Sequence, residues 1–406
     1  MHLFLENSRC GDDGFVHSIF NDAIASMDRY TQIRREIHRY PEVSNNEENT
    51  ARIIENELDA LEIPYVSGIA GHGIVATIAG SKPGKTVGLR ADMDALRIQE
   101  DNQVEYKSSN MGCMHACGHD AHMAILLHTG NLLQSMRETF SGKIKLIFQP
   151  AEEMSPVGGS RRMLASGAID DLDVIYGLHV WPDLPFGHVG IKSGALMAAS
   201  DHFLVKIYGK ASHAAQPHEG IDSILVGADF VKNVQSIVSR RINPLRTAVV
   251  SIGMFNGGVR YNIVAPECTL EGTVRTFDVQ TRNQVQDEIS SILEKTCNMY
   301  GAKFDLKYER GYMPVINDKY SLSIIESAAL SLFGEENVHY VEDPSTIAED
   351  FAFYLESIPG AFVWLGLTHD GFRQALHTSK FDLDERIIPR GAALLTQTAV
   401  QYLNKM

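Results

Sequence analysis

Stretches with helical periodicity alternate with short apolar runs along the first half of the chain. A helix is expected from about Ile19 to Tyr40, and Pro41 stops it because the residue before a proline disfavours the helical conformation. Glu47 to Leu61 predicts a second helix, and Ala121 to Thr139 predicts a later one. Strands that alternate with helices predict an α/β fold with a mostly parallel sheet. The β-rich runs are GIVATIAG, TVGLRADMD, KIKLIFQP and DVIYGLHV.

The pattern changes near Ser193. The runs DHFLVKIYG, TAVVSIGMFNGG and CTLEGTVRTFD alternate apolar and polar residues, which is typical of an antiparallel sheet. Two helical stretches, about Ser223 to Arg240 and Gln280 to Tyr300, lie among them. After about Lys307 buried strands and helices return, including AFVWLGL and a final helix from Asp384 to Leu403. We therefore predict a small α+β domain, residues 193–305, inserted into a larger domain of residues 1–192 and 306–406.

Bulk composition narrows the range of partners. The 406 residues are too many for one ordinary core, which agrees with two domains. A formal net charge of -15 argues against a nucleic-acid or membrane partner, since nucleic acids and anionic membranes are both polyanions. No apolar segment reaches the roughly 18 residues that a membrane helix needs, and the N-terminus lacks a secretory signal pattern. The odd, scattered set of five cysteines favours no disulfide framework and predicts a cytoplasmic location.

Polar residues with catalytic chemistry follow several of the predicted strands. Asp92 and Asp94, Glu152 and Glu153, and His179 come at the carboxyl ends of three of them. In a parallel sheet, ligands bind beyond those ends. We therefore expect these side chains to gather around one site.

The stretch MHACGHDAHM could be a metal site, a redox site or a polar loop. Cys113 and Cys117 have three residues between them, which is not the spacing of a C-x-x-C redox motif. Cys117 and His119 can contact one ion or two neighbouring ions, and a thiolate with an imidazole suits Zn, Co, Ni or Mn better than Ca or Mg. We interpret these two as metal ligands, and His115 and His122 as loop or helix positions.

The other candidates each have a structural alternative. Adjacent carboxylates such as Glu152 and Glu153 are commonly a solvated surface, but one can bind a metal while its neighbour acts as general base toward metal-bound water. His179 could be a core histidine, and His377 could cap the helix after it. His213, bordered by small residues, has space around its ring for a substrate, although a surface position would fit it as well.

Seven motifs occur in one order: LRADMDAL, MHACGHDAHM, FQPAEE, GLHVWP, ASHAAQPHEG, EDFAFY and LHTSKFD. In this order they resemble the M20 metallopeptidase family, most closely its amidohydrolase branch, which includes aminoacylases, hippurate hydrolases and auxin-conjugate hydrolases. The segment REIHRYPEVSNNEENTA is similar to that branch as well, so the resemblance spans about residues 30 to 400. It implies a metal-binding catalytic domain with an inserted lid or dimerisation domain.

The resemblance also implies a site of two divalent metal ions, with Mn or Zn first and Co or Ni as alternatives. A cysteine thiolate would bridge the two ions, in place of the bridging carboxylate of peptidase relatives. The implied ligands are Cys117 as the bridge, His119 and His179 on one metal, and Glu153 and His377 on the other.

The remaining roles follow from the same resemblance. Glu152 would be the general base, and Asp92 would support a ligand histidine by hydrogen bonding, with Asp120 in a similar role. His213 would reach across a homodimer into the partner's active site and stabilise the oxyanion. The carboxylate of the substrate would be held by Asn262 and Arg275.

The predicted function is metal-dependent hydrolysis of N-acyl amino acids to a carboxylate and a free amino acid. Glu152 would take a proton from water between the metals and pass it to the leaving amine. A metallo-carboxypeptidase or dipeptidase is one alternative, although the cysteine motif points away from it. The other is a non-catalytic binding protein whose metals only stabilise the fold. Five ligands over two metals favour open coordination positions, because a structural zinc site normally has four ligands and no vacancy.

Overall fold

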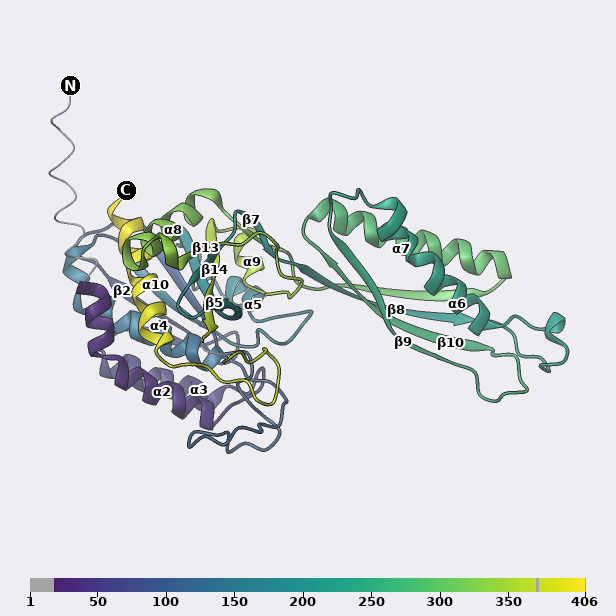
Figure 1. The fold of residues 1–406 in the computed structure, drawn as a ribbon, viewed down its shortest axis with the longest axis horizontal. Helices are drawn as coiled ribbons and strands as arrows, with labels where there is room; N and C mark the ends of the chain where they lie inside the picture. Colours follow the sequence, from purple (N-terminus) through teal and green to yellow (C-terminus); the bar gives the residue numbers. More distant parts are fainter. Residues whose placement is uncertain (1–17, 370–371, 406) are drawn as a thin grey trace, which may run out of the picture. The chain divides into compact units, whose positions relative to one another are not determined.

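In the computed structural model, which describes residues 18–369 and 372–405, the chain forms two compact units (Figure 1). The large unit comprises the described residues up to Leu196, Ile316–Asp343 and the residues from Asp350 onward. The small unit comprises Met197–Val315 and Pro344–Glu349. Each unit buries an apolar core of its own.

The sheet of the large unit is formed by the strands that the apolar runs predict. Within the described residues, eight strands lie in the order β1-β2-β4-β3-β5-β14-β6-β13. Neighbouring strands from β4 to β14 are parallel, whereas β1, β2 and β4 pair antiparallel, as do β14 and β6. Every residue of β3 is buried, which explains why the central strands read as continuous apolar runs. The prediction of an α/β fold with a mostly parallel sheet is confirmed. The bounds are β1 Tyr65–Ile69, β2 Gly73–Ala79, β3 Thr86–Asp92, β4 Lys143–Gln149, β5 Val174–Pro185, β6 Val189–Ile191, β13 Val338–Tyr340 and β14 Gly360–Thr368.

Helices of the large unit cover this sheet. Helices α4 (His119–Ser135) and α10 (Ile387–Asn404) pack against each other, and most of their residues are buried (Figure 1). The helix expected over residues 19–40 is interrupted at Ser26, whose hydroxyl donates to the carbonyl of Asp22 at 2.8 Å. No helix in the described part of the chain is long and apolar enough to cross a membrane. The other helices are α2 Met27–Arg39, α3 Glu48–Ala60, α5 Ser160–Ala165, α8 Lys319–Phe333 and α9 Ala352–Leu355.

The small unit is an antiparallel sheet with helices α6 (Ser223–Val234) and α7 (Val279–Tyr300) packed on it (Figure 1). Its strands lie in the order β11-β8-β10-β9. Alternate residues of β8 are buried, because successive side chains of a strand point to opposite faces of the sheet. The expectation of an α+β insert is confirmed. The strand bounds are β8 Ala199–Tyr208, β9 Ala248–Gly257, β10 Glu267–Thr276 and β11 Lys303–Arg310.

The boundaries predicted for the inserted domain need correction. Residue 305 falls inside β11, which pairs with β8 along its whole length, so the small unit continues to Val315. The segment Pro344–Glu349 also belongs to it, and the backbone amide of Ala198 donates to the carbonyl of Ser345 at 3.0 Å. The catalytic and lid roles of the two parts stay predictions.

A buried ion pair joins α7 to the sheet of the small unit. The Nε of Arg282 on α7 donates to both carboxylate oxygens of Asp201 on β8, at 3.1 and 3.0 Å. Asp201 also accepts hydrogen bonds from the hydroxyl of Tyr308 at 2.8 Å and the backbone amide of Gly311 at 3.1 Å. Both charged side chains are almost completely buried. Removal of one partner would leave an uncompensated buried charge.

Replacing Arg282 by alanine should therefore destabilise the small unit by about 3–5 kcal/mol. The measurement is hydrogen exchange of the amides of β8 and α7 in the full chain. Lys232→Ala is the matched control, because Lys232 is 78% exposed and its pairing with Asp229 is a surface contact worth about 0–1 kcal/mol. Equal exchange rates in the two variants would contradict a stabilising role for the buried pair.

Candidate metal centre

The register of the sheet brings polar residues of neighbouring strands to one level. Asp92, the last residue of β3, pairs with the last residue of β4. Arg90 of β3 pairs with Gly177 of β5, so Asp92 lies level with His179, two residues further along each strand. His179 lies inside β5 and not at its end, because that strand continues to Pro185. The neighbouring strand β3, however, ends at the level of His179, so among the described residues the rest of β5 has no partner strand on that side and is open to the site.

The thiol of Cys117 lies at the centre of a cluster of possible metal ligands. Its Sγ is 3.4 Å from Nε2 of His179 and 3.3 Å from Nε2 of His377. Nε2 of His377 is in turn 3.2 Å from Oε1 of Glu153. The structure thus brings together all the ligand residues that the sequence suggested. Three overlapping groups have their ligand atoms within 4.8 Å of one another: Cys117–His119–His179, Cys117–Glu153–His377 and His119–Glu152–Glu153.

Backbone carbonyls orient two of the imidazole rings. Nδ1 of His119 lies 2.8 Å from the carbonyl oxygen of Asp94, and Nδ1 of His179 lies 2.6 Å from that of Val180. A carbonyl can only accept a hydrogen bond, so in each ring Nδ1 is the donor. In a neutral ring Nε2 then carries the lone pair that a metal ion needs.

Asp94 fixes the loop that carries both glutamates. Its two carboxylate oxygens accept hydrogen bonds from the backbone amides of Glu152 and Glu153, each at 3.0 Å, and its Oδ2 also accepts from the hydroxyl of Ser44 at 2.6 Å. The sequence placed Asp94 at the end of a strand but assigned it no role. The signal that could have found it is the spacing D-x-D, which puts Asp92 and Asp94 on the same side of an extended chain.

The surroundings of the cluster favour positive charge. Burial disfavours an ionised His119, but the carboxylates of Asp92 and Asp94 outweigh burial and raise the pKa of His119 to about 10. Burial and the carboxylates of Glu153 and Glu152 raise the pKa of the Cys117 thiol well above its usual value. Both effects are those expected of a buried, net negative site that attracts a cation.

His377 reaches the cluster from a loop with unusual backbone geometry. Its φ of 59° lies in the left-handed region, which non-glycine residues seldom adopt. Its backbone amide donates to the carbonyl of Ala116 at 2.8 Å, which holds this loop to the segment that carries Cys117. Its side chain is 47% exposed, so it forms the solvent-facing side of the cluster.

Asp92 contacts a histidine that the sequence did not connect with the site. Its Oδ1 is 2.7 Å from Nδ1 of His122, whereas its Oδ2 is 3.7 Å from Nε2 of His119. Arg90 donates to Oδ2 of Asp92 at 2.6 Å. Asp92, His119 and His122 could form another metal-binding group, but both ring nitrogens of His122 already have partners, since Nε2 accepts from the amide of Val180.

Asp120 has a different role from the one suggested. In the described residues its carboxylate lies 2.7 Å from Nε of Arg34 and 2.7 Å from Nδ1 of His38, and it accepts from the amide of Ala121. Burial would raise the pKa of Asp120, but Arg34 and His38 hold it below its usual value. Asp120 therefore anchors the start of α4 to α2 and does not hydrogen-bond a predicted ligand.

The residues present fit a divalent metal ion. Thiolate, imidazole and carboxylate are donors that Zn, Mn, Co and Ni accept. Nε2 of His119 is buried and makes no hydrogen bond to the described residues, so it can offer a lone pair to the interior of the cluster once a metal ion has displaced its proton. The donors come from separate segments of the large unit, as expected of a site assembled by the fold.

Two of the predicted substrate-contacting residues lie together in the small unit. His213 is exposed, and its Nδ1 accepts a hydrogen bond from the amide of Ala215 at 3.1 Å. In a neutral ring this leaves Nε2 as the donor. The amide of Ala214 donates to the carbonyl of Asn262 at 3.1 Å, which holds the segments of His213 and Asn262 side by side.

Arg275 on β10 is engaged within its own unit. Its Nε donates to the carbonyl of Thr346 at 3.1 Å, and its Nη1 donates to the carbonyl of Val274 at 3.0 Å. Burial lowers the pKa of Arg275. His213, in contrast, lies outside the strands of this sheet, where it forms an isolated bridge with Ile263.

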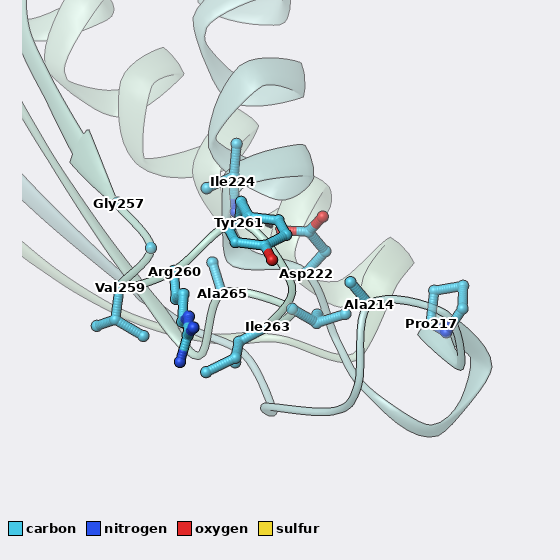
Figure 2. A pocket seen from close by; sticks show the side chains of 12 residues that line it. Ala214, Pro217, Asp222, Ile224, Gly257, Val259, Arg260, Tyr261, Ile263 and Ala265 are labelled. Carbon is cyan, nitrogen blue, oxygen red and sulfur yellow. Dashed lines mark hydrogen bonds between the residues drawn. The ribbon is translucent and has the colours of Figure 1, made fainter.

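A pocket lies beside the segments of His213 and Asn262 (Figure 2). It is bounded by the turn after β9 and by the start of α6, where Asp222 caps the helix by accepting from the amide of Ile224 at 3.0 Å. Tyr261 in this turn is 90% exposed. The lining residues are Ala214, Pro217, Asp222, Ile224, Gly257, Gly258, Val259, Arg260, Tyr261, Ile263, Val264 and Ala265.

Comparison with known proteins agrees with this geometry. Residues 88–401 match the model of peptidase family M20/M25/M40. The chain is 42% identical to an N-acyl-L-amino acid amidohydrolase of Geobacillus stearothermophilus, over 70% of this chain and 76% of that protein. It is 35% identical to thermostable carboxypeptidase 1 of Saccharolobus solfataricus, over 96% and 99%.

A solved structure also resembles the whole chain. The Bacillus subtilis YXEP protein, described as a dinuclear metal binding peptidase from the M20 family, has a TM-score of 0.83 at 33% identity, covering 94% of this chain and 99% of that one. The resemblance carried by the seven ordered motifs is thus confirmed, and the chain belongs to peptidase family M20/M25/M40.

Proposed function

We propose that the protein is a metal-dependent hydrolase that cleaves the amide bond of N-acyl amino acids. The observation that carries the proposal is the pair of donor groups that share Cys117, with Glu152 in a third group beside them. Similarity to a relative named N-acyl-L-amino acid amidohydrolase supports the substrate class.

The proposed metal site has two divalent ions bridged by Cys117. His119 and His179 would hold one ion, and Glu153 and His377 the other, a division that the short distances within each group support. When bound, such ions lower the pKa of a coordinated water and polarise a carbonyl group. Mn or Zn is our first proposal, with Co or Ni as alternatives. We also propose a cytoplasmic location, where reducing conditions would keep Cys117 available as a ligand.

Glu152 is the proposed general base. Its side chain is buried, its Oε1 accepts from the amide of Asp350 at 3.4 Å, and its own amide is held by Asp94. A carboxylate fixed in this way can take a proton from the attacking water and deliver it to the leaving amine. Asp92, predicted to support a ligand histidine, would do so only indirectly, because its hydrogen bond is to His122.

A second copy of the chain is the proposed partner. Strand β9 is the outer strand of its sheet, and an outer strand offers unpaired backbone groups for association. Two copies related by a twofold axis would bury the apolar side chains there. His213 would then donate its Nε2 hydrogen to the oxyanion in the other copy, while Asn262 and Arg275 would hold the substrate's carboxylate. The exposed apolar residues on and near this edge are Ile224, Leu225, Leu245, Met254 and Phe255.

A carboxypeptidase or dipeptidase activity is the second candidate, favoured by the relative named thermostable carboxypeptidase 1. Both substrate classes present an amide whose nitrogen belongs to a residue with a free carboxylate, so they differ on the acyl side. Parallel assays on N-acetyl amino acids, hippurate and dipeptides separate them, and we expect the acyl substrates to be hydrolysed faster. No hydrolysis on the whole panel would favour a non-catalytic, metal-stabilised binding protein.

Replacing Glu152 by glutamine should lower kcat by about 10²–10⁴ while metal content stays at the wild-type level, because only the proton acceptor is removed. The measurement is steady-state hydrolysis of the best N-acyl amino acid, with metal content measured on the same samples. Glu138→Gln, at a site 79% exposed, should match the wild type. Wild-type turnover in Glu152→Gln would refute the mechanism, and full hydrolysis by chelated protein would exclude a catalytic metal.

Metal affinity should rise with pH between about pH 6 and 8. Cys117 and His119 both have raised pKa values in the protein without metal, the latter about 10, so an ion must displace a proton from each. Zn²⁺ titrations at several pH values measure this dependence. Cys117→Ala should bind Zn²⁺ more weakly. Its affinity should also rise about tenfold less per pH unit than that of the wild type, since one fewer proton is displaced. Cys113→Ala is the control and should keep the wild-type slope; an unchanged slope in Cys117→Ala would argue against a thiolate ligand.

Two inactive variants should complement each other if the active site is shared between copies. His213→Ala lacks the proposed oxyanion donor and Glu152→Gln lacks the base, so a mixed dimer would contain one intact site. Mixing the two under conditions of subunit exchange should restore part of the wild-type activity. Exchange without any recovery would contradict a role for His213 across the dimer.

A further inference from the structure

We propose that His122 is a positioning residue that fixes the ring of His179 through the backbone of Val180. The proposal rests on the proposed metal-binding function of His179. It concerns a histidine whose two ring nitrogens both have hydrogen-bond partners already, so that it is not one of the proposed ligands.

The two ring nitrogens of His122 have fixed and opposite roles. His122 is buried on α4, and its Nδ1 is 2.7 Å from a carboxylate oxygen of Asp92. A carboxylate only accepts, so Nδ1 is the donor. Its Nε2 accepts the backbone amide hydrogen of Val180 at 3.0 Å. The neutral ring is thus held at both ends.

The next peptide group along the strand, joined to the first at the Cα of Val180, then orients His179. The carbonyl of Val180 accepts from Nδ1 of His179 at 2.6 Å, which leaves Nε2 of His179 facing the thiol of Cys117 at 3.4 Å. Both polar backbone groups of Val180 are therefore used to connect the two imidazoles, whose centroids are 4.6 Å apart. A rotation of the backbone at Val180 would move this carbonyl and so turn the His179 ring away from the thiol.

Neighbouring contacts keep this connection rigid. Arg90 donates to Asp92 at 2.6 Å and to Asp350 at 2.9 Å, so the carboxylate behind His122 is itself held by a buried cation. On the other side, Gly118 has a φ of 92°, and a Cβ there would lie 2.4 Å from a methyl carbon of Val180. The glycine thus allows the start of α4 to pack directly on Val180.

Loss of the acceptor on His122 would leave the amide of Val180 buried and unpaired. An unpaired buried amide is costly, so the backbone at Val180 would shift until the amide found another partner. His179 would then lose the fixed carbonyl that defines its tautomer. Partners of this kind commonly contribute about 10–100-fold to metal affinity.

Two substitutions of similar size separate the two ends of the ring. The side-chain amide of asparagine reaches the position of Nδ1 and can donate to Asp92, but it does not reach Val180. That of glutamine reaches the position of Nε2 and can accept from Val180. We expect His122→Asn to weaken Co²⁺ binding at one of the two sites about 10–100-fold, and His122→Gln to bind close to the wild-type affinity. Optical titration of the full chain with Co²⁺ measures both steps.

His128→Asn is the matched control. His128 is buried on the same helix, but it stacks on Tyr30 at 4.2 Å and contacts the hydroxyl of Ser26 at 2.9 Å, away from the cluster. It should bind Co²⁺ as the wild type does. Equal losses in His122→Asn and His128→Asn, or wild-type affinity in His122→Asn, would overturn the proposal.

A second readout needs neither metal nor substrate. Hydrogen exchange at the amide of Val180 in metal-free protein should accelerate in His122→Asn and stay slow in His122→Gln. Unchanged exchange in both variants would overturn the proposal even if N-acyl amino acids are hydrolysed. Conversely, wild-type turnover in Glu152→Gln would refute the proposed mechanism and leave the exchange result standing.

Discussion

The carboxylate of Asp94 is the contact on which the loop of Glu152 and Glu153 depends. It is fully buried, and a buried carboxylate is tolerated only when donors surround it. Burial would raise its pKa, but the hydrogen bonds from His119 and Ser44 and the amide of Glu153 lower it. The ionised side chain therefore holds the proposed base and the neighbouring proposed ligand through their backbone amides, so the position of this loop does not depend on the carboxylates of the two glutamates.

Strained backbone accompanies this arrangement at two points. Ala151 has a φ of 57° and directly precedes the two glutamates, and its amide donates to Glu47 at 2.8 Å. His377 has a φ of 59° and is held by the carbonyl of Ala116. Each left-handed residue costs free energy that surrounding hydrogen bonds must offset, and such residues concentrate at functional sites.

The sequence predicted well which polar residues gather at the ends of the strands. It predicted poorly which residues support them by hydrogen bonding. Polar residues after apolar runs meet because parallel strands end at one edge, and the register of Arg90 with Gly177 brings Asp92 level with His179. The roles of Asp94 and His122 were not predicted, because they depend on which backbone amides lie near these side chains, and no local sequence pattern encodes that. The boundary at 305 was wrong because it falls inside β11, whose pairing with β8, about a hundred residues earlier in the chain, is not visible in the local sequence pattern.

Backbone groups set most of the orientation of the side chains in the cluster. Carbonyls of Asp94 and Val180 set the imidazoles of His119 and His179, and amides fix the loop of the glutamates. A backbone-based frame changes little when surrounding side chains are exchanged, whereas His213 and Asn262 lie on exposed or half-exposed segments of the small unit. Residues on such segments vary at small cost to stability. A fold built in this way can alter the group it recognises while it keeps the same donor atoms in place, which is consistent with relatives whose names describe both amidohydrolases and carboxypeptidases.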